Sequence, residues 1–156
     1  MRAGWKVWPI AAVMAFLSLA SPGQSPPSCC GRLVLLLIDV EALACAPCSA
    51  PLDELGRALP PSVLAERLKG ILVYRDPDLQ GPSGRRGRIA RVRWSGFARG
   101  HDVRFPVAFD DGQSFQIESG AGFAAILADF EAGTVRKIPG PIRAREIAEI
   151  ASFACR

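Results

Sequence analysis

Histidine is nearly absent from this chain of 156 residues, in which His101 is the only one. A zinc site that used the spacing of Cys45 and Cys48 would need a second cysteine pair of that kind, or two histidines. The chain offers neither. The sequence therefore argues against a metal centre, and we expect no metal and no other cofactor.

A large excess of charge of one sign is also missing. The formal net charge is +4, and two of the basic residues, Arg2 and Lys6, lie within the first 20 residues, which contain no acid. The rest of the chain has 17 basic residues against 15 acidic ones, a net charge of +2. This charge is too small to attract a polyanion, so we expect no nucleic-acid partner.

Nor does the chain contain an apolar run of the roughly 20 residues that a membrane-spanning helix needs. A shorter run is present: Arg2 and Lys6 precede the apolar residues 10–17, and residues 18–20 are the small residues that a signal peptidase reads. We therefore predict a signal peptide in residues 1–20 and a protein that is periplasmic or secreted. In the alternative, this segment is an uncleaved N-terminal membrane anchor.

A linker rich in proline and serine, residues 21–31, follows the signal segment. The remaining residues, 32–156, suffice for one domain with its own apolar core. The apolar content of 49% and the charged content of 22% are those of a globular protein. We expect this domain to be a monomer.

Five cysteines are present, Cys29, Cys30, Cys45, Cys48 and Cys155. Exported proteins use cysteines mainly as structural disulfides, but an odd number leaves at least one thiol unpaired or paired between molecules. The adjacent Cys29 and Cys30 are poorly placed to bond to each other. Either one of them reaches Cys155, or both are exposed thiols.

The pair at Cys45 and Cys48 lies where an apolar strand, residues 33–38, is followed by a helical pattern that starts near Ala46. A helix N-terminus under the first sulfur favours the thiolate over the thiol. The spacer residues Ala46 and Pro47 place Cys48 about one turn further on. We interpret Cys45 as the nucleophile and Cys48 as the resolving thiol.

Periodicity and turn residues predict an alternation of strands and helices that ends in a hairpin and a helix. Such an order indicates an α/β sandwich. The expected strands are residues 33–40, 71–74, 103–109, 123–128 and 134–138, with helices over 46–59, 62–68, 85–99 and 143–153, a helix end at Gly70, loops at 77–84 and 110–112, and a short helical turn within 113–120.

The predicted helix over residues 85–99 carries six arginines and no acid. Ile89, Val92 and Phe97 form its expected buried stripe. We interpret the arginines as a solvated basic face rather than as an anion site.

In this order of elements, three features resemble the thioredoxin fold, and in particular exported proteins of the TlpA/ResA and AhpC/TSA type. Cys45-Ala46-Pro47-Cys48 differs by one residue from the Cys-Gly-Pro-Cys of thioredoxins, and Asp39 lies six residues before Cys45. The segment Phe105-Pro106-Val107-Ala108-Phe109-Asp110-Asp111-Gly112 is similar to the family's F-P-V-x-x-D-x-x-G. The resemblance covers residues 32–153 and implies a three-layer α/β sandwich: a mixed central sheet with flanking helices and a C-terminal β-hairpin plus helix.

The resemblance also implies roles for single residues. Asp39 would lie behind Cys48 and accept its proton. The family usually has a cis-proline facing the cysteines at the start of the hairpin strand. Phe123 or its neighbour takes that position if Asp129 ends the strand, which is the alignment we prefer. The alternative makes Pro106 the cis-proline and 106–109 the hairpin strand. Ala44 replaces the family's tryptophan.

By this resemblance the protein is expected to be a thiol–disulfide oxidoreductase with a redox-active Cys45–Cys48 disulfide. Its partners would be protein thiols or disulfides and an upstream electron donor or acceptor, with membrane contact only if the N-terminal segment is retained. One alternative is a binding or assembly module in which the Cys45–Cys48 disulfide is structural. Another is a metal-handling or peroxide-reacting relative, for which no further ligand and no activating Thr/Arg pair is evident. The sequence does not fix the direction of electron flow.

Overall fold

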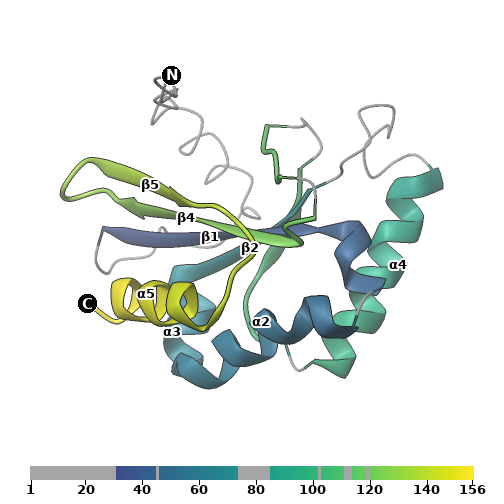
Figure 1. Ribbon diagram of the computed structural model, residues 1–156, viewed down its shortest axis with the longest axis horizontal. Helices are drawn as coiled ribbons and strands as arrows, with labels where there is room; N and C mark the ends of the chain where they lie inside the picture. The colour runs from purple at the N-terminus through teal and green to yellow at the C-terminus, as the bar shows by residue number, and fades with distance from the viewer. Residues whose placement is uncertain (1–30, 45, 74–84, 102, 111–113, 119) are drawn as a thin grey trace, which may run out of the picture. The chain divides into compact units, whose positions relative to one another are not determined.

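Five strands form one mixed sheet in the order β3-β2-β1-β4-β5 (Figure 1). The computed structural model describes residues 31–44, 46–73, 85–101, 103–110, 114–118 and 120–156. All of them belong to one unit, Gly31–Arg156. The predicted signal segment (1–20), most of the linker (21–31) and the predicted loop 77–84 lie outside the described residues.

The strands follow the apolar segments of the sequence. β1 is central and pairs in parallel with β2, which pairs in parallel with β3, while β4 pairs with β1 and β5 with β4 in antiparallel fashion. β1 is buried on both faces, as its unbroken apolar run predicts. The strand bounds are β1 Arg32–Asp39, β2 Leu68–Val73, β3 Val107–Phe109, β4 Phe123–Asp129 and β5 Thr134–Ile138.

The described helices all cover one face of the sheet (Figure 1). They are the 3-10 helix η1 Val40–Ala44 and the α-helices α2 Ala46–Ala58, α3 Pro61–Arg67, α4 Arg85–Gly100 and α5 Ala144–Ala154. The predicted α/β class, with a mixed sheet and a C-terminal hairpin plus helix, is confirmed. The third layer of the expected sandwich is not among the described elements.

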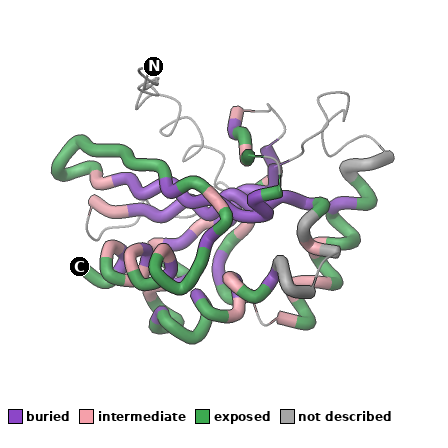
Figure 2. The backbone as a smooth tube through the Cα atoms, viewed as in Figure 1, coloured by how far each residue is buried: buried purple, intermediate pink, exposed green. Residues whose placement is uncertain are grey.

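The core between the sheet and these helices is built from alternate strand residues. On β1, Val34, Leu36 and Ile38 point into it and are fully buried. Leu55 of α2 and Ile150 of α5 meet them from the helix side and are also fully buried. Figure 2 shows the buried stretches concentrated in the central strands and on the inner sides of the helices.

β2 begins three residues earlier than predicted, at Leu68 instead of residue 71. Gly70 therefore does not end a helix, which was the expectation, but lies inside the strand. A Cβ at this position would come within 2.9 Å of both Phe105 and Val107. The glycine is there because the neighbouring segment packs directly onto the strand backbone.

The helix predicted over residues 85–99 is confirmed as α4. Of the predicted buried stripe, Phe97 is confirmed, but Ile89 and Val92 are wrong. Ile89 is 44% exposed and Val92 is 72% exposed. The side of α4 that meets the core carries Ala90, Trp94 and Phe97. These three positions are spaced by four and three residues and therefore share one helix face, which Ile89 and Val92 do not.

The segment between α4 and β4 is less regular than predicted. Only Val107–Phe109 of the expected strand 103–109 is strand, and it is an edge strand, as Pro106 indicated. Asp110 is 1% exposed and accepts hydrogen bonds from the N–H groups of Ser114 (2.9 Å) and Phe115 (2.8 Å). No helical turn is present within the described residues 114–118.

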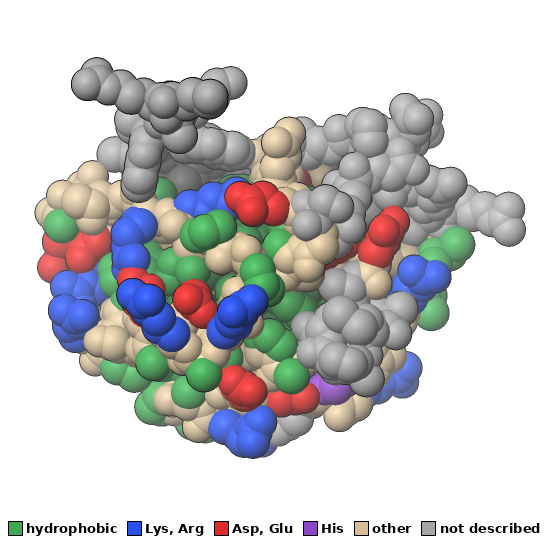
Figure 3. Space-filling model, in the orientation of Figure 1, with side chains coloured by type: hydrophobic (Ala, Val, Ile, Leu, Met, Phe, Trp, Pro, Cys, Tyr) green, Lys and Arg blue, Asp and Glu red, His purple; other side chains and the backbone are tan. Residues whose placement is uncertain are grey.

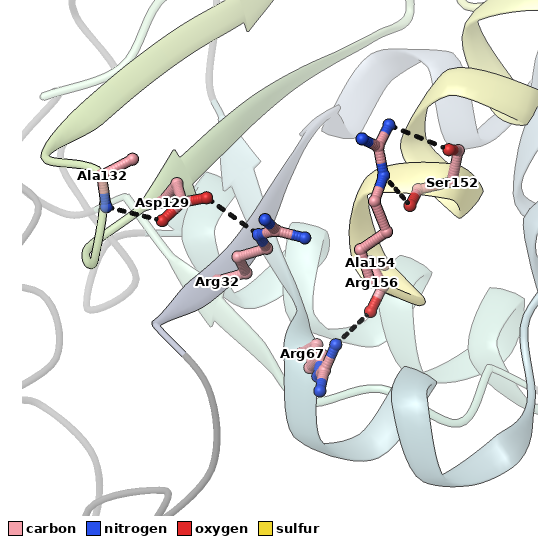
Figure 4. A network of polar contacts seen from close by, with 7 residues as sticks. All are labelled: Arg32, Arg67, Asp129, Ala132, Ser152, Ala154 and Arg156. Atoms are coloured by element: carbon pink, nitrogen blue, oxygen red, sulfur yellow. Dashed lines mark hydrogen bonds and ion pairs between the residues drawn. The ribbon is translucent and has the colours of Figure 1, made fainter.

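The C-terminal helix is fixed to the sheet and to α3 by arginines (Figure 4). Arg32 donates to Asp129 at 2.8 Å and lies 5.5 Å from the ring centre of Phe153 in α5. Arg67 donates to the carbonyl of Ala154 at 2.6 Å. These contacts join both ends of the described unit.

Candidate functional site

The Cys-x-x-Cys motif lies at the junction between the end of β1 and the start of α2. β1 ends at Asp39, η1 covers residues 40–44, and α2 begins at Ala46. The predicted strand–helix junction is therefore confirmed, with a turn of 3-10 helix inserted. Pro47 and Cys48 belong to the first turn of α2, while Cys45 lies outside the described residues.

Only the backbone of Cys48 is described, so the reactivity of the two thiols stays a prediction. Two properties of the backbone bear on it. The first turn of α2 has N–H groups without partners in the helix, and the helix dipole places partial positive charge there. A sulfur at this end is stabilised as the thiolate.

Asp39, the predicted proton acceptor, is buried at the end of β1 and 1% exposed. Its Oδ1 atom accepts a hydrogen bond from the N–H of Glu41 at 2.9 Å, within the turn that leads into η1. Its own N–H donates to the carbonyl of Gly122 at 2.9 Å. The carboxyl group is thus held at the base of the segment that carries the motif.

Phe123 begins β4 directly beside the end of β1. It pairs with Ile38 in the antiparallel register and is 1% exposed. The predicted hairpin is present as β4 and β5, so the alignment that gives Phe123 the position of the family's proline fits the register. Within the described part of the chain, the only cis peptide bond precedes Pro141, not Phe123 or Pro106.

The alternative alignment, in which Pro106 is the cis-proline and 106–109 is the hairpin strand, is wrong. Residues 107–109 form β3, which pairs in parallel with β2 at the edge of the sheet. The carbonyl of Pro106 accepts a hydrogen bond from the N–H of Gly70 at 2.9 Å. Pro106 therefore directly precedes an edge strand on the other side of β1 from the hairpin.

Three further observations concern metal ligands, membrane spans and free thiols among the described residues. None of their His, Cys, Asp and Glu side chains form a group of three or more suited to a metal ion. No helix in this part of the chain combines the length and apolarity needed to cross a membrane. Cys155 is an exposed free cysteine.

One pair of polar residues was not anticipated from the sequence. His101 lies directly after α4, with Nδ1 3.0 Å from one carboxylate oxygen of Asp53 and 3.1 Å from the other. Its ring stacks on Phe97 with a centroid distance of 4.1 Å. Figure 3 shows the histidine, the only one in the chain, at the surface beside acidic side chains.

No family model and no curated protein matches the chain. Among solved structures, it is similar to a thioredoxin-related protein from Neisseria meningitidis serogroup B, with 12% sequence identity and a TM-score of 0.47. The match covers 85% of this chain and 91% of that chain. By its own strand order and strand directions, the described unit has a thioredoxin-like α/β fold. The narrower TlpA/ResA type stays a prediction.

Proposed function

We propose that this chain is an exported thiol–disulfide oxidoreductase that works through Cys45 and Cys48. The observation that carries the proposal is the position of the motif at the start of α2, directly after a buried central strand. In a thioredoxin-like fold this junction is where a dithiol meets a helix N-terminus and a partner protein. The expected localisation is the periplasm or the extracellular space.

The proposed reaction is a pair of thiol–disulfide exchanges. The Cys45 thiolate attacks one sulfur of a partner disulfide, which forms a mixed disulfide and releases the other partner sulfur as a thiolate that takes up a proton. Cys48 loses its proton and attacks Cys45, which releases the second partner sulfur. The partner gains two electrons and two protons, and Cys45–Cys48 becomes a disulfide. An upstream dithiol reverses this oxidation.

Asp39 supports the second exchange as the proton acceptor for Cys48. It is the buried carboxyl group at the end of β1, and a fixed acid–base group near a reacting thiol typically contributes 10²–10⁴-fold to a rate. The hydrogen bond from Glu41 fixes the orientation of its carboxylate. Asp39 is proposed to act on the proton, and not on the sulfur–sulfur bond.

A second candidate function is a binding or assembly module in which the Cys45–Cys48 disulfide is structural. Phe123, where the family usually has its cis-proline, favours it. The peptide bond before Phe123 is not cis, and a bulky buried ring occupies the start of β4. A partner strand would meet different backbone geometry there.

An insulin-reduction assay with dithiothreitol separates the two candidates. We expect Cys45→Ser to lower the rate about 100-fold or more, because the attacking thiolate is removed. Cys155→Ser is the matched control. It removes an exposed thiol near the C-terminal end of the sequence and should leave the rate unchanged. Wild-type protein without activity, or equal rates for wild type and Cys45→Ser, would assign the motif a structural role.

A further inference from the structure

The outer face of α4 carries two apolar side chains that are exposed to solvent. Ile89 is 44% exposed and Val92 is 72% exposed, the largest exposed fraction among the large apolar residues of the described chain. The two lie three residues apart and therefore share one side of the helix. Gly96, four residues after Val92, continues this side, and a Cβ there would meet no atom within 4 Å.

Two exposed arginines flank this apolar strip and complete the outer face. Arg93 lies four residues after Ile89. Arg99 lies seven residues after Val92, two turns further along the same side. Nε of Arg99 donates to the carbonyl of Ser95 at 3.1 Å in an exposed contact. The sequence of α4 contains neither Asp nor Glu, so no acid of the helix itself offsets these charges.

The packing of α4 does not require the apolar residues of this face. The opposite side of the helix meets the core through Ala90, Trp94 and Phe97. The sequence predicts a solvated basic face because it places Ile89 and Val92 in the core, and their exposure removes that explanation. A solvated helix face is normally polar, so apolar side chains grouped between arginines indicate a contact surface.

We propose that the outer face of α4 docks on an anionic membrane surface. Arg93 and Arg99 pair with the phosphate groups of the lipids, since guanidinium groups bind phosphate with charge-assisted hydrogen bonds. Ile89 and Val92 enter the boundary between headgroups and acyl chains. The contact uses neither cysteine of the motif and does not depend on residues 1–20 remaining attached, so it goes beyond the proposed redox function.

The shape and the charge of this face favour lipid over other partners. α4 lies at the margin of the described unit (Figure 1), and a protruding helix needs a groove in a protein partner, whereas lipid headgroups rearrange around it. A second copy docked through the same face would place arginine against arginine. A nucleic acid would pair with Arg93 and Arg99 but would leave Ile89 and Val92 in water.

Co-sedimentation of the full chain with lipid vesicles tests the proposal. The probes are vesicles of phosphatidylcholine alone and vesicles in which about a third of the lipid is anionic phosphatidylglycerol. We expect the anionic vesicles to bind at least about 10-fold more tightly, and the difference to shrink when added salt screens the charges. Equal binding to both kinds of vesicle, or no binding to the anionic vesicles, would overturn the proposal.

Two pairs of exposed substitutions locate the contact. Val92→Gln should weaken binding to anionic vesicles about 3-fold or more, while Val135→Gln, at a 39% exposed position on β5, should leave it unchanged. Arg93→Gln should weaken it about 3-fold or more, while Arg145→Gln, at an exposed position on α5, should not.

Binding as in wild type by Val92→Gln and Arg93→Gln would place the contact elsewhere in the chain and overturn the proposal. Weaker binding by only one of the two would also overturn it, because docking requires both charge and apolar contact. Loss in Arg93→Gln alone would point to a polyanion as the partner.

Val92→Trp tests the same contact by a gain of binding, which misfolding does not produce. Tryptophan is favoured at the membrane interface, so this variant should bind anionic vesicles about 3-fold more tightly than wild type. Unchanged or weaker binding by a folded Val92→Trp variant would contradict the insertion of this face.

Discussion

The two halves of α2 differ in where the partners of their polar residues lie in the sequence. The first turn carries Pro47 and Cys48, whose partners in the motif are neighbours in the sequence. The middle of the helix carries Asp53, whose partner His101 lies 48 positions further on. Chemistry built from neighbouring residues can be recognised from spacing alone. Chemistry built across the fold requires the fold.

The largest expected effect comes from truncating a side chain that packs α2 against the core. Leu55 lies between the two halves of α2 and is fully buried. We expect Leu55→Ala to lower the free energy of unfolding by about 2–5 kcal/mol, through lost apolar burial and the cavity that remains. Urea denaturation measures this, with Val92→Ala on exposed α4 as the control that should change stability by less than about 0.5 kcal/mol. Similar losses for the two variants would contradict the packing of α2 described above.

Asp39→Asn tests the proposed proton acceptor behind the motif. The substitution keeps the shape of the side chain but removes the proposed proton acceptor, so we expect the insulin-reduction rate to fall about 10- to 100-fold. If the rate is unaffected while the protein remains folded, Asp39 has no part in proton transfer.

Gly56→Ala tests the middle of α2, and Gly96→Ala in α4 is its matched comparison. Both glycines lie inside helices, and neither Cβ would meet an atom within 4 Å. Each substitution should therefore raise the free energy of unfolding by about 0.5–1 kcal/mol, because alanine has the higher helix propensity. Thermal unfolding measures the change. Destabilisation by Gly56→Ala alone would mean that the space beside it is filled.

The smallest expected effect lies at Asp129, at the opposite end of β4 from Phe123. Hydrogen bonds from the N–H of Ala132 and from the Arg32 side chain lower the pKa of this carboxyl below its usual 3.8. The contribution to stability is complete above that pH and is lost as the pH falls through the lower pKa of the folded state.

Wild type should therefore be more stable than Asp129→Asn at neutral pH, and the difference should shrink as the pH falls below about 3.8. Urea denaturation at a series of pH values measures this. Glu118→Gln, at an exposed position, is the control that should show no such change. A difference that grows on acidification would contradict the ion pair.

Most of the fold was predictable because it follows local patterns. The apolar run of β1, the Pro60-Pro61 break between α2 and α3 and the alternation in β5 all indicate their elements directly. The predictions failed where contacts with a distant segment determine the local structure. The sequence around Gly70 predicts a helix end, but Phe105 and Val107 pack onto this glycine, which is part of a strand.

The candidate site likewise has a part that the sequence predicts and a part that it does not. The strand–helix junction at the motif and the burial of Asp39 follow from the sequence around them. The pairing of His101 with Asp53 does not, because the sequence contains no signal that brings α4 back to the middle of α2. An isolated histidine gives no indication of its partner.

The central claim is that Cys45 is the nucleophile and Cys48 the resolving thiol. Trapping the mixed disulfide tests it most directly. The full chain with Cys48→Ser, and with Cys29, Cys30 and Cys155 also replaced by serine, is mixed with a peptide disulfide and analysed by mass spectrometry. The account predicts one peptide per protein, attached at Cys45 and stable because no resolving thiol remains. It is contradicted if Cys45 forms no adduct, or if a matched variant that keeps Cys48 instead of Cys45 forms the adduct equally fast.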